Sequence, residues 1–326
     1  MEKLEVVKFE PGLEKDWDEF VDVSNNGTLF HKRAFLNYHP QDRFIDDSLL
    51  FFKKSSLFAV LPAAARHGDP EKLLVSHPGS SFGGFVCRQD LSLRDATRLI
   101  NALKKYAAAQ HYGGIDLTLP PSIYLERPSH YLDFALYQAG FRYRKRELSS
   151  VIPLVVDEQN VLKLFSSASR RAVRRAQKLG VEVRIDDNYQ AFYQILQNNL
   201  KLRHNVIPTH TLDELEKLAQ WFPEDVFLFS AYVDERMVGG VTLFNANAHA
   251  TLAFYISHDE AYQKYRAVNL LFYEVCKWCV QHKFKYLDFG LFTVNMDPNW
   301  GLGRFKEGFG AQGVFRDSMR LALVNR

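Results

Sequence analysis

The chain has 326 residues, of which 47% are hydrophobic and 24% charged, and its formal net charge is +3 at pH 7. This composition indicates a globular protein long enough for two domains, and the charge is too small to indicate nucleic-acid binding by itself. No apolar run approaches the roughly 18 residues of a membrane-spanning helix, and the amino terminus lacks the basic-then-apolar pattern of a secretory signal. We therefore expect a cytoplasmic protein without a transmembrane segment.

Hydrophobic periodicity predicts a series of α/β elements in the first half. They are a strand hairpin, a glycine-rich stretch, a helix, a strand, a glycine-phenylalanine turn and a final strand. These elements are expected at 48–53 with 57–62, 78–84, 92–110, 115–119, 139–143 and 149–154, respectively.

Between the halves, residues 166–180 predict a helix with a basic stripe. At about 100° per residue, five basic side chains fall within an arc of roughly 140°, opposite an apolar face. From residue 163 to 184 the only acid is Glu182. Like charges on one face repel, which an anionic ligand would relieve, although a solvated charged face is the alternative. We assign Arg170, Arg174 and Arg175 to substrate binding.

The next segment, residues 201–215, combines a loop with a helix start. Thr211 and Glu214 have the spacing of a capping box, so Thr211 is expected to be structural. His210 precedes this cap, and a helix N-terminus lowers the pKa of a histidine and favours its neutral form. Neutral His210 is therefore a candidate general base. The alternative is an ordinary surface histidine.

The second half repeats the order of the first, with a hairpin, a strand, a helix, a strand, a glycine-phenylalanine turn and a final strand. These are expected at 226–232 with 237–244, 252–256, 267–281, 287–289, 307–310 and 318–324, respectively. The shared order predicts a duplicated α/β unit. Cys276 and Cys279 lie in the expected helix, without a second cysteine pair or a histidine doublet nearby, so we expect no metal site.

Six of the eighteen glycines lie between Gly290 and Gly313. The strand before them carries Asp288, and residues 301–310 are expected to form a glycine-rich loop whose backbone approaches a ligand closely. Lys306 would be a cation held against this curved surface. Asp288 and Lys306 are therefore candidate catalytic residues, and a tight structural turn is the alternative.

Together these motifs resemble the FemAB-like branch of the GNAT acyltransferase superfamily, which includes peptidoglycan-bridge aminoacyltransferases and acetyltransferase relatives. The resemblance rests on the arginine-rich helix at 170–181, Pro208 to Leu215, Asn269-Leu-Leu, Asp288-Phe-Gly290, and Gly301 to Gly310. It implies two tandem GNAT-like domains, each a mixed, mostly antiparallel sheet flanked by helices. We place them at residues 1–155 and 156–326, with the site in the second.

The resemblance also implies roles for single residues. In relatives, a lysine after phenylalanine helps to hold the acyl donor or the charge that develops during transfer. This role falls to Lys306, with Phe305 shaping the wall, and Asp288 would orient the acceptor amine or accept its proton. Such a cation would stabilise an oxyanion.

Donor binding is assigned to Arg266 and Asn269 beside Phe305, and substrate binding includes Tyr255. An ordinary GNAT domain has a glycine where this chain has Arg266, so binding of acetyl-CoA in the usual pose stays open. Free amides at the helix start would still suit a phosphate.

We therefore expect an acyltransferase, an N-acetyltransferase with an acyl-CoA donor, that acts on an amino group of a cell-envelope sugar or peptide precursor. The acceptor would be a small molecule or a lipid- or nucleotide-linked precursor. One alternative is transfer of an amino acid from aminoacyl-tRNA to a peptidoglycan precursor. Another is a non-catalytic module that binds an anionic glycan or nucleic acid.

Overall fold

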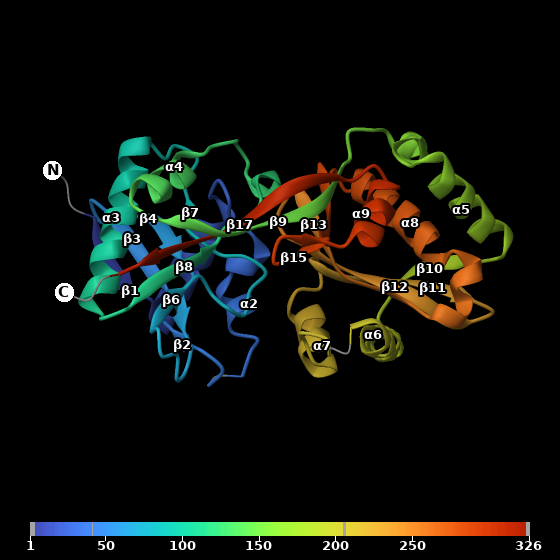
Figure 1. The fold of residues 1–326 in the computed structure, drawn as a ribbon, viewed down its shortest axis with the longest axis horizontal. Coiled ribbons are helices and arrows are strands. Elements are labelled where there is room, and N and C mark those ends of the chain that lie inside the picture. The colour runs from blue at the N-terminus through green and yellow to red at the C-terminus, as the bar shows by residue number, and fades with distance from the viewer. Residues whose placement is uncertain (1–3, 41, 205–206, 324–326) are drawn as a thin grey trace. The chain divides into compact units, whose positions relative to one another are not determined.

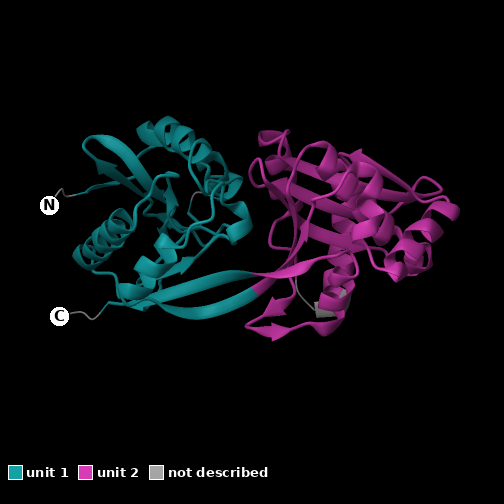
Figure 2. Cartoon of the chain, turned by 90° about the horizontal axis from the view of Figure 1, so that it is seen from above, with its two compact units in different colours: residues 1–147, 315–326 teal, residues 148–314 magenta. Residues whose placement is uncertain are grey.

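The chain folds into two compact units, Met1–Glu147 with Phe315–Arg326 and Leu148–Val314 (Figure 2). The computed structural model describes residues 4–40, 42–204 and 207–323. The expected domains are residues 1–155 and 156–326. The units differ from them mainly at the carboxyl end, because Phe315–Arg326 belongs to the first unit.

The first unit contains a four-stranded sheet with a helix on each face. Its strands in hydrogen-bonded order and its two helices are β1 (Glu5–Lys8), β3 (Leu49–Lys53), β4 (Ser56–Leu61), β7 (Val86–Cys87), α1 (Glu14–Asp22) and α3 (Leu93–Ala109). Successive side chains of a strand point to opposite faces. Leu50 accordingly shares a core with Trp17 of α1, whereas Leu49 and Phe51 share one with Leu99 of α3. The sheet is therefore buried on both faces.

The remaining elements of the first unit are short, apart from its last strand. They are α2 (Arg33–Leu36), β2 (Ile45–Asp46), β5 (Ala64–Ala65), β6 (Leu73–Val75), β8 (Gly114–Thr118), α4 (Tyr131–Gln138), β17 (Gln312–Ala322) and 3-10 turns at Pro11–Leu13, Leu29–His31 and Ser122–Tyr124. β17 pairs with β8, β8 with β6, β6 with β5, and β5 with β2.

The second unit contains a larger sheet with helices on both faces (Figure 1). Its strands in order are β10 (Glu182–Asp186), β11 (Val226–Val233), β12 (Arg236–Asn245), β13 (Ala250–His258), β14 (Tyr286–Leu291) and β9 (Arg142–Pro153). Its helices are α5 (Ser167–Lys178), α6 (Tyr189–His204), α7 (Leu212–Trp221), α8 (Ala267–Gln281) and α9 (Trp300–Glu307), with 3-10 turns at Glu158–Leu164 and Glu260–Tyr265. A separate two-stranded ribbon pairs β15 (Thr293–Val294) with β16 (Asp297–Pro298). On β12, Val241 packs in the core with Leu271 of α8, while Gly240 faces the ring of Phe192 on α6.

The final strand of each half pairs with the sheet of the other half. β9 pairs antiparallel with β14, where Ile152 is opposite Leu287, and β17 pairs antiparallel with β8, where Met319 is opposite Leu117. Ile152 is buried in the core of the second unit and Met319 in that of the first. The sequence assigns β9 and β17 to the sheets of their own halves, and this prediction is wrong. The alternation of apolar residues identifies a strand but does not specify its partner.

Most other expectations for the fold are confirmed. α8 has the expected bounds, and β11 and β12 form the expected hairpin. Asp234 and Glu235 in its turn have positive φ values of 47° and 59°, as the favoured two-residue hairpin turn requires. β13 pairs in parallel with β14 and β6 with β8, while most neighbours are antiparallel. Both units are thus mixed, mostly antiparallel sheets flanked by helices.

The glycine-rich stretch is a helix and not the expected loop. α9 covers most of residues 301–310, and the side chain of Asn299 caps its start by accepting a hydrogen bond from the N–H of Leu302 at 3.0 Å. Gly303 packs against Phe292, whose ring would lie 3.0 Å from a Cβ at this position. Glycine here allows a close contact of the helix, and the cap offsets its low helix propensity.

Candidate active site

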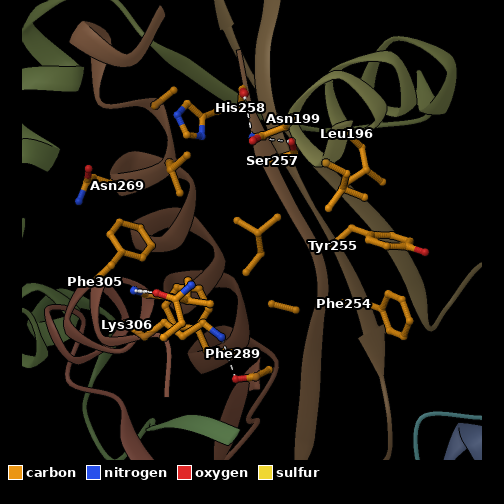
Figure 3. Close-up of a pocket in the computed structure, with 18 of the residues that line it drawn as sticks. Leu196, Asn199, Phe254, Tyr255, Ser257, His258, Asn269, Phe289, Phe305 and Lys306 are labelled. Carbon is orange, nitrogen blue, oxygen red and sulfur yellow. Dashed lines mark hydrogen bonds between the residues drawn. The ribbon is translucent and has the colours of Figure 1, made fainter. Parts of the chain in front are cut away.

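The second unit contains a cavity of about 840 Å³ that opens where two parallel strands part (Figure 3). β13 and β14 pair over three residues each, ending at Leu252 and Asp288. Beyond that level Ala253 and Gly290 line the cavity. The cavity is also lined by α6, by the start of α8 and by α9, so it is reached by elements from both faces of the sheet.

Irregularities in both strands explain why they diverge. On β13 an extra residue, Phe254, interrupts the register with β12. On β14 the register with β9 shifts between Asp288 and Leu291, where Gly290 has a φ of 76°. A bulge bends its strand and increases the local twist. Gly290 is suited to this position because a side chain would be strained at such a φ.

Lys306 projects from α9 onto the end of β14, at the wall of the cavity. Its side chain is buried, and its Nζ donates hydrogen bonds to the backbone oxygens of Gly290 and Leu291, both at 2.8 Å. Burial lowers its pKa to about 8, and the negative charge of Asp288 opposes this shift. An ammonium has three donors, and two of them hold the strand end. The candidate cation is thus fixed where β14 leaves the sheet.

Asp288 lies behind the cavity wall and does not line it. Its buried carboxylate accepts hydrogen bonds from the hydroxyl of Ser149 and from the N–H of Gly290, the latter at 2.9 Å. These contacts join β14 to β9 and stabilise the turn at Gly290. Asp288 thus contacts groups of the sheet and the turn, and its negative charge raises the pKa of Lys306.

His210 is buried beside Tyr255 and is not on the surface. The hydroxyl of Tyr255 lies 2.9 Å from Nδ1 of His210 and accepts a hydrogen bond from its backbone N–H at 3.0 Å. Tyr255 lines the cavity, whereas His210 does not. Burial raises the pKa of Tyr255 to about 12, so this phenol is neutral near pH 7. His210 therefore contacts the cavity through its neighbours Tyr255 and Phe254, both of which line it. The capping box of Thr211 and Glu214, which follows it, is confirmed.

Arg266, Asn269 and Phe305 all line the cavity. Arg266 ends the turn at Glu260–Tyr265 and precedes α8, and its φ of 59° and ψ of 31° are left-handed. The backbone thus adopts at this arginine the conformation that glycine favours. Strained residues of this kind concentrate at functional sites.

The three arginines of α5 lie outside the cavity. α5 packs by Val173 and Ala176 and leaves Arg174 and Arg175 exposed, as the periodicity predicts. Arg170 is partly buried, and its guanidinium donates to the backbone oxygen of Phe165 at 2.9 Å. The structure therefore does not bring this basic face together with Lys306.

Sequence reasoning missed a polar group in the cavity. The side-chain amide of Asn199 on α6 donates to the hydroxyl of Ser257 at 3.1 Å and to the backbone oxygen of His258 at 3.2 Å. Figure 3 shows these residues opposite Asn269, across the cavity. No short motif marks Asn199, because its role depends on the packing of α6 on β13.

Neither a metal site nor a membrane span is found in the described part of the chain. Within residues 4–40, 42–204 and 207–323, no group of three or more metal-ligating side chains is present. Cys276 and Cys279 are free, buried thiols on α8. No helix of the described residues is long and apolar enough to cross a bilayer.

Known proteins resemble this chain in the sequence of its second unit and in its fold. Residues 165–306 match the family model described as an acetyltransferase (GNAT) domain. No curated protein matches the sequence. The fold is similar to a structure titled "Crystal structure of FemX", with a TM-score of 0.76 and 14% identity over 98% of both chains.

Two further structures show the same fold over most of the chain. One is the C-terminal domain of a putative lysylphosphatidylglycerol synthetase from Agrobacterium fabrum, with a TM-score of 0.61 and 10% identity over 95% of this chain and 92% of the other. The other is a tandem GNAT protein from the clavulanic acid biosynthesis pathway, with a TM-score of 0.56 and 10% identity over 98% of both chains.

The fold is therefore similar to that of tandem GNAT proteins over most of the chain. The family match places a GNAT acetyltransferase domain in the second unit, which contains the cavity, Arg266 and Lys306. The resemblance to the FemAB-like branch is confirmed in fold.

Proposed function

We propose that the protein transfers an acyl group from acyl-CoA to an amino group of a small cell-envelope sugar or peptide precursor. The observation that carries the proposal is the cavity between β13 and β14, which has a cation at the strand end and a helix start at its rim. The fold likeness to structures titled FemX and lysylphosphatidylglycerol synthetase supports an acceptor from the cell envelope.

The start of α8 is the proposed site for the donor's phosphates. Backbone N–H groups at a helix N-terminus favour anions, and the left-handed conformation of Arg266 gives the chain a glycine-like turn at this point. Arg266 also brings a permanent positive charge to the cavity wall. The residues present therefore fit a phosphorylated donor, and Arg266 has the left-handed backbone conformation that glycine adopts readily.

A bound acyl-CoA would supply the acyl carbon and a thiolate leaving group. The acceptor amine forms the new C–N bond as the C–S bond breaks, and the amine proton passes to the thiolate or to solvent. Negative charge develops on the acyl oxygen during this step, and a fixed cation stabilises such charge most effectively in a site shielded from water. Lys306 is the buried cation of the cavity wall that we assign to this role.

The acceptor would enter from the side of α6. Leu196 and Asn199 of α6 and Tyr255 of β13 line the cavity opposite Asn269 and Phe305 (Figure 3). We assign acceptor contacts to this side, with Tyr255 as a neutral hydrogen-bonding group held by His210.

The exposed basic face of α5 favours a second candidate function, transfer of an amino acid from aminoacyl-tRNA to a peptidoglycan precursor. Arg174 and Arg175 lie outside the cavity and would suit a polyanion larger than CoA.

Two assays separate the alternatives. Acetyl-CoA with amino-sugar and peptide precursors should release free thiol in proportion to acylated product, without sensitivity to ribonuclease. A reaction that proceeds only with aminoacyl-tRNA and stops after ribonuclease treatment would replace the first proposal with the second. Ligand binding without turnover by either donor would indicate a non-catalytic module.

A further inference from the structure

A separate face of the first unit exposes a cluster of aromatic side chains. Of the eight aromatic side chains that are exposed in the described part of the chain, five lie on α4 and on adjoining segments of β9 and β17. We call this cluster the aromatic face, and its members are Tyr131, Phe134, Tyr137, Tyr143 and Phe315. Exposed apolar patches of this kind on soluble proteins mark interaction sites.

The aromatic face on α4 follows from its sequence. Tyr131, Phe134 and Tyr137 are spaced three residues apart, so they share one side of the helix. Ala135 and Leu136 occupy the opposite side and are buried in the core of the first unit. Phe134 and Tyr137 are each 54% exposed. The core of the first unit therefore leaves this aromatic stripe largely uncovered.

Arginine side chains pack against three of these rings. The guanidinium of Arg142 lies 4.7 Å from the ring centre of Tyr137 and donates to its backbone oxygen at 3.2 Å. The guanidinium of Arg146 lies 4.4 Å from the ring centre of Tyr143 and 3.9 Å from that of Phe315. The helix and both strands therefore each contribute a ring that lies against an arginine.

The charge of this surface is basic. Residues 142–146 contain four basic side chains, and no acid interrupts them. Asp317 forms an ion pair with Arg146 at 2.9 Å and Asp116 one with Arg144 at 3.2 Å, while Asp133 lies 3.7 Å from His130. Two of these acids are thus paired with arginines of the run, whereas Asp133 faces a histidine, which the formal charge counts as neutral. Four basic side chains against three acids leave a small excess of positive charge.

We propose that the aromatic face docks the first unit on an anionic phospholipid surface. Aromatic rings favour the headgroup region of a bilayer, and nearby arginine and lysine side chains are attracted to anionic headgroups. A nucleic acid fits less well, because it binds rings by stacking on their faces. Guanidinium groups already cover faces of Tyr137, Tyr143 and Phe315.

Sedimentation of the full chain with lipid vesicles tests this proposal. Wild-type protein should bind vesicles that contain phosphatidylglycerol and bind pure phosphatidylcholine vesicles much more weakly. The double variant Phe134→Ser/Tyr137→Ser should lower the partition coefficient by about tenfold or more, since membrane binding scales with buried apolar area. Trp221→Ser is the matched control, because Trp221 is an exposed ring of the second unit with Lys217 above it. It should bind like wild type.

A charge reversal tests the electrostatic part without removing any aromatic ring. Arg142→Glu should lower binding to anionic vesicles by at least about fivefold, whereas Arg174→Glu on α5 makes the same change in net charge and should have little effect. Thermal unfolding should show that all variants remain folded. The proposal is overturned if wild type binds neither vesicle, or if the double serine variant binds as tightly as wild type. It is also overturned if that variant instead abolishes self-association or RNA binding.

Discussion

Replacement of Lys306 by methionine separates a catalytic cation from a structural one. Methionine keeps the length and apolar stem of lysine but removes the ammonium that donates to the oxygens of Gly290 and Leu291. If the ammonium stabilises the charge of the transition state, kcat should fall by about 10²–10³ while KM changes little.

The effect of this change on stability should be small, because two contributions oppose each other. Burial lowers the pKa of Lys306 from 10.5 to about 8, which corresponds to about 3 kcal/mol of unfavourable free energy for the charged form. Methionine removes this term but leaves two carbonyl groups unpaired, at about 1–3 kcal/mol each. We therefore expect the free energy of unfolding to change by less than about 3 kcal/mol.

Steady-state kinetics and denaturant unfolding of the same preparations measure both effects. Lys277→Met is the matched control, because Lys277 lies on α8 and pairs with Glu274 outside the cavity. It should leave kcat unchanged. A Lys306→Met enzyme with normal kcat, or one in which only KM rises, would refute the assignment of Lys306 to transition-state stabilisation.

Three further outcomes follow from the same geometry. The pKa of Lys306 in the folded state lies below its unfolded value. The free energy of unfolding should therefore rise with pH between about 8 and 10.5, where only the unfolded state holds the proton. The acylation rate should fall above about pH 8, and a rate that stays constant up to about pH 10 would contradict this. Arg266→Gly should remove the backbone strain of a left-handed arginine and raise the free energy of unfolding by up to about 1 kcal/mol. The KM for acyl-CoA should increase, and an unchanged KM would exclude a donor contact. Reversal of Arg174 and Arg175 to glutamate should leave the melting temperature and CoA binding unchanged, since both side chains are exposed outside the cavity; weaker tRNA binding in a filter assay would favour the second candidate function.

Local patterns predicted much of the fold, because they depend on neighbouring residues. The bounds of α8, the hairpin turn at Asp234 and Glu235, and the capping box at Thr211 all follow from periodicity or turn chemistry. The outward basic face of α5 follows from the helical repeat alone. The strand before Gly290 is also present as expected.

The site could be predicted only in part, because its geometry depends on tertiary contacts. Lys306 and Asp288 do lie close together, but on a helix and a strand end, because Asn299 caps α9 and glycine permits its close packing. The pairing of His210 with Tyr255 joins a loop to a strand, and no local pattern encodes it. The pairing of β9 with β14 and of β17 with β8 likewise could not be predicted, because the alternation of side chains does not specify strand partners.

Hydrogen exchange with and without acetyl-CoA tests the central claim most directly, because it locates the donor without altering the protein. The account predicts slower exchange of backbone amides in the part of β13 after Leu252 and at the start of α8 near Arg266, where the strands part and the helix begins. Amides of the edge strand β10 should be unaffected. If acetyl-CoA at a concentration that supports turnover protects neither segment, or protects only amides outside the cavity, the proposed donor site is wrong.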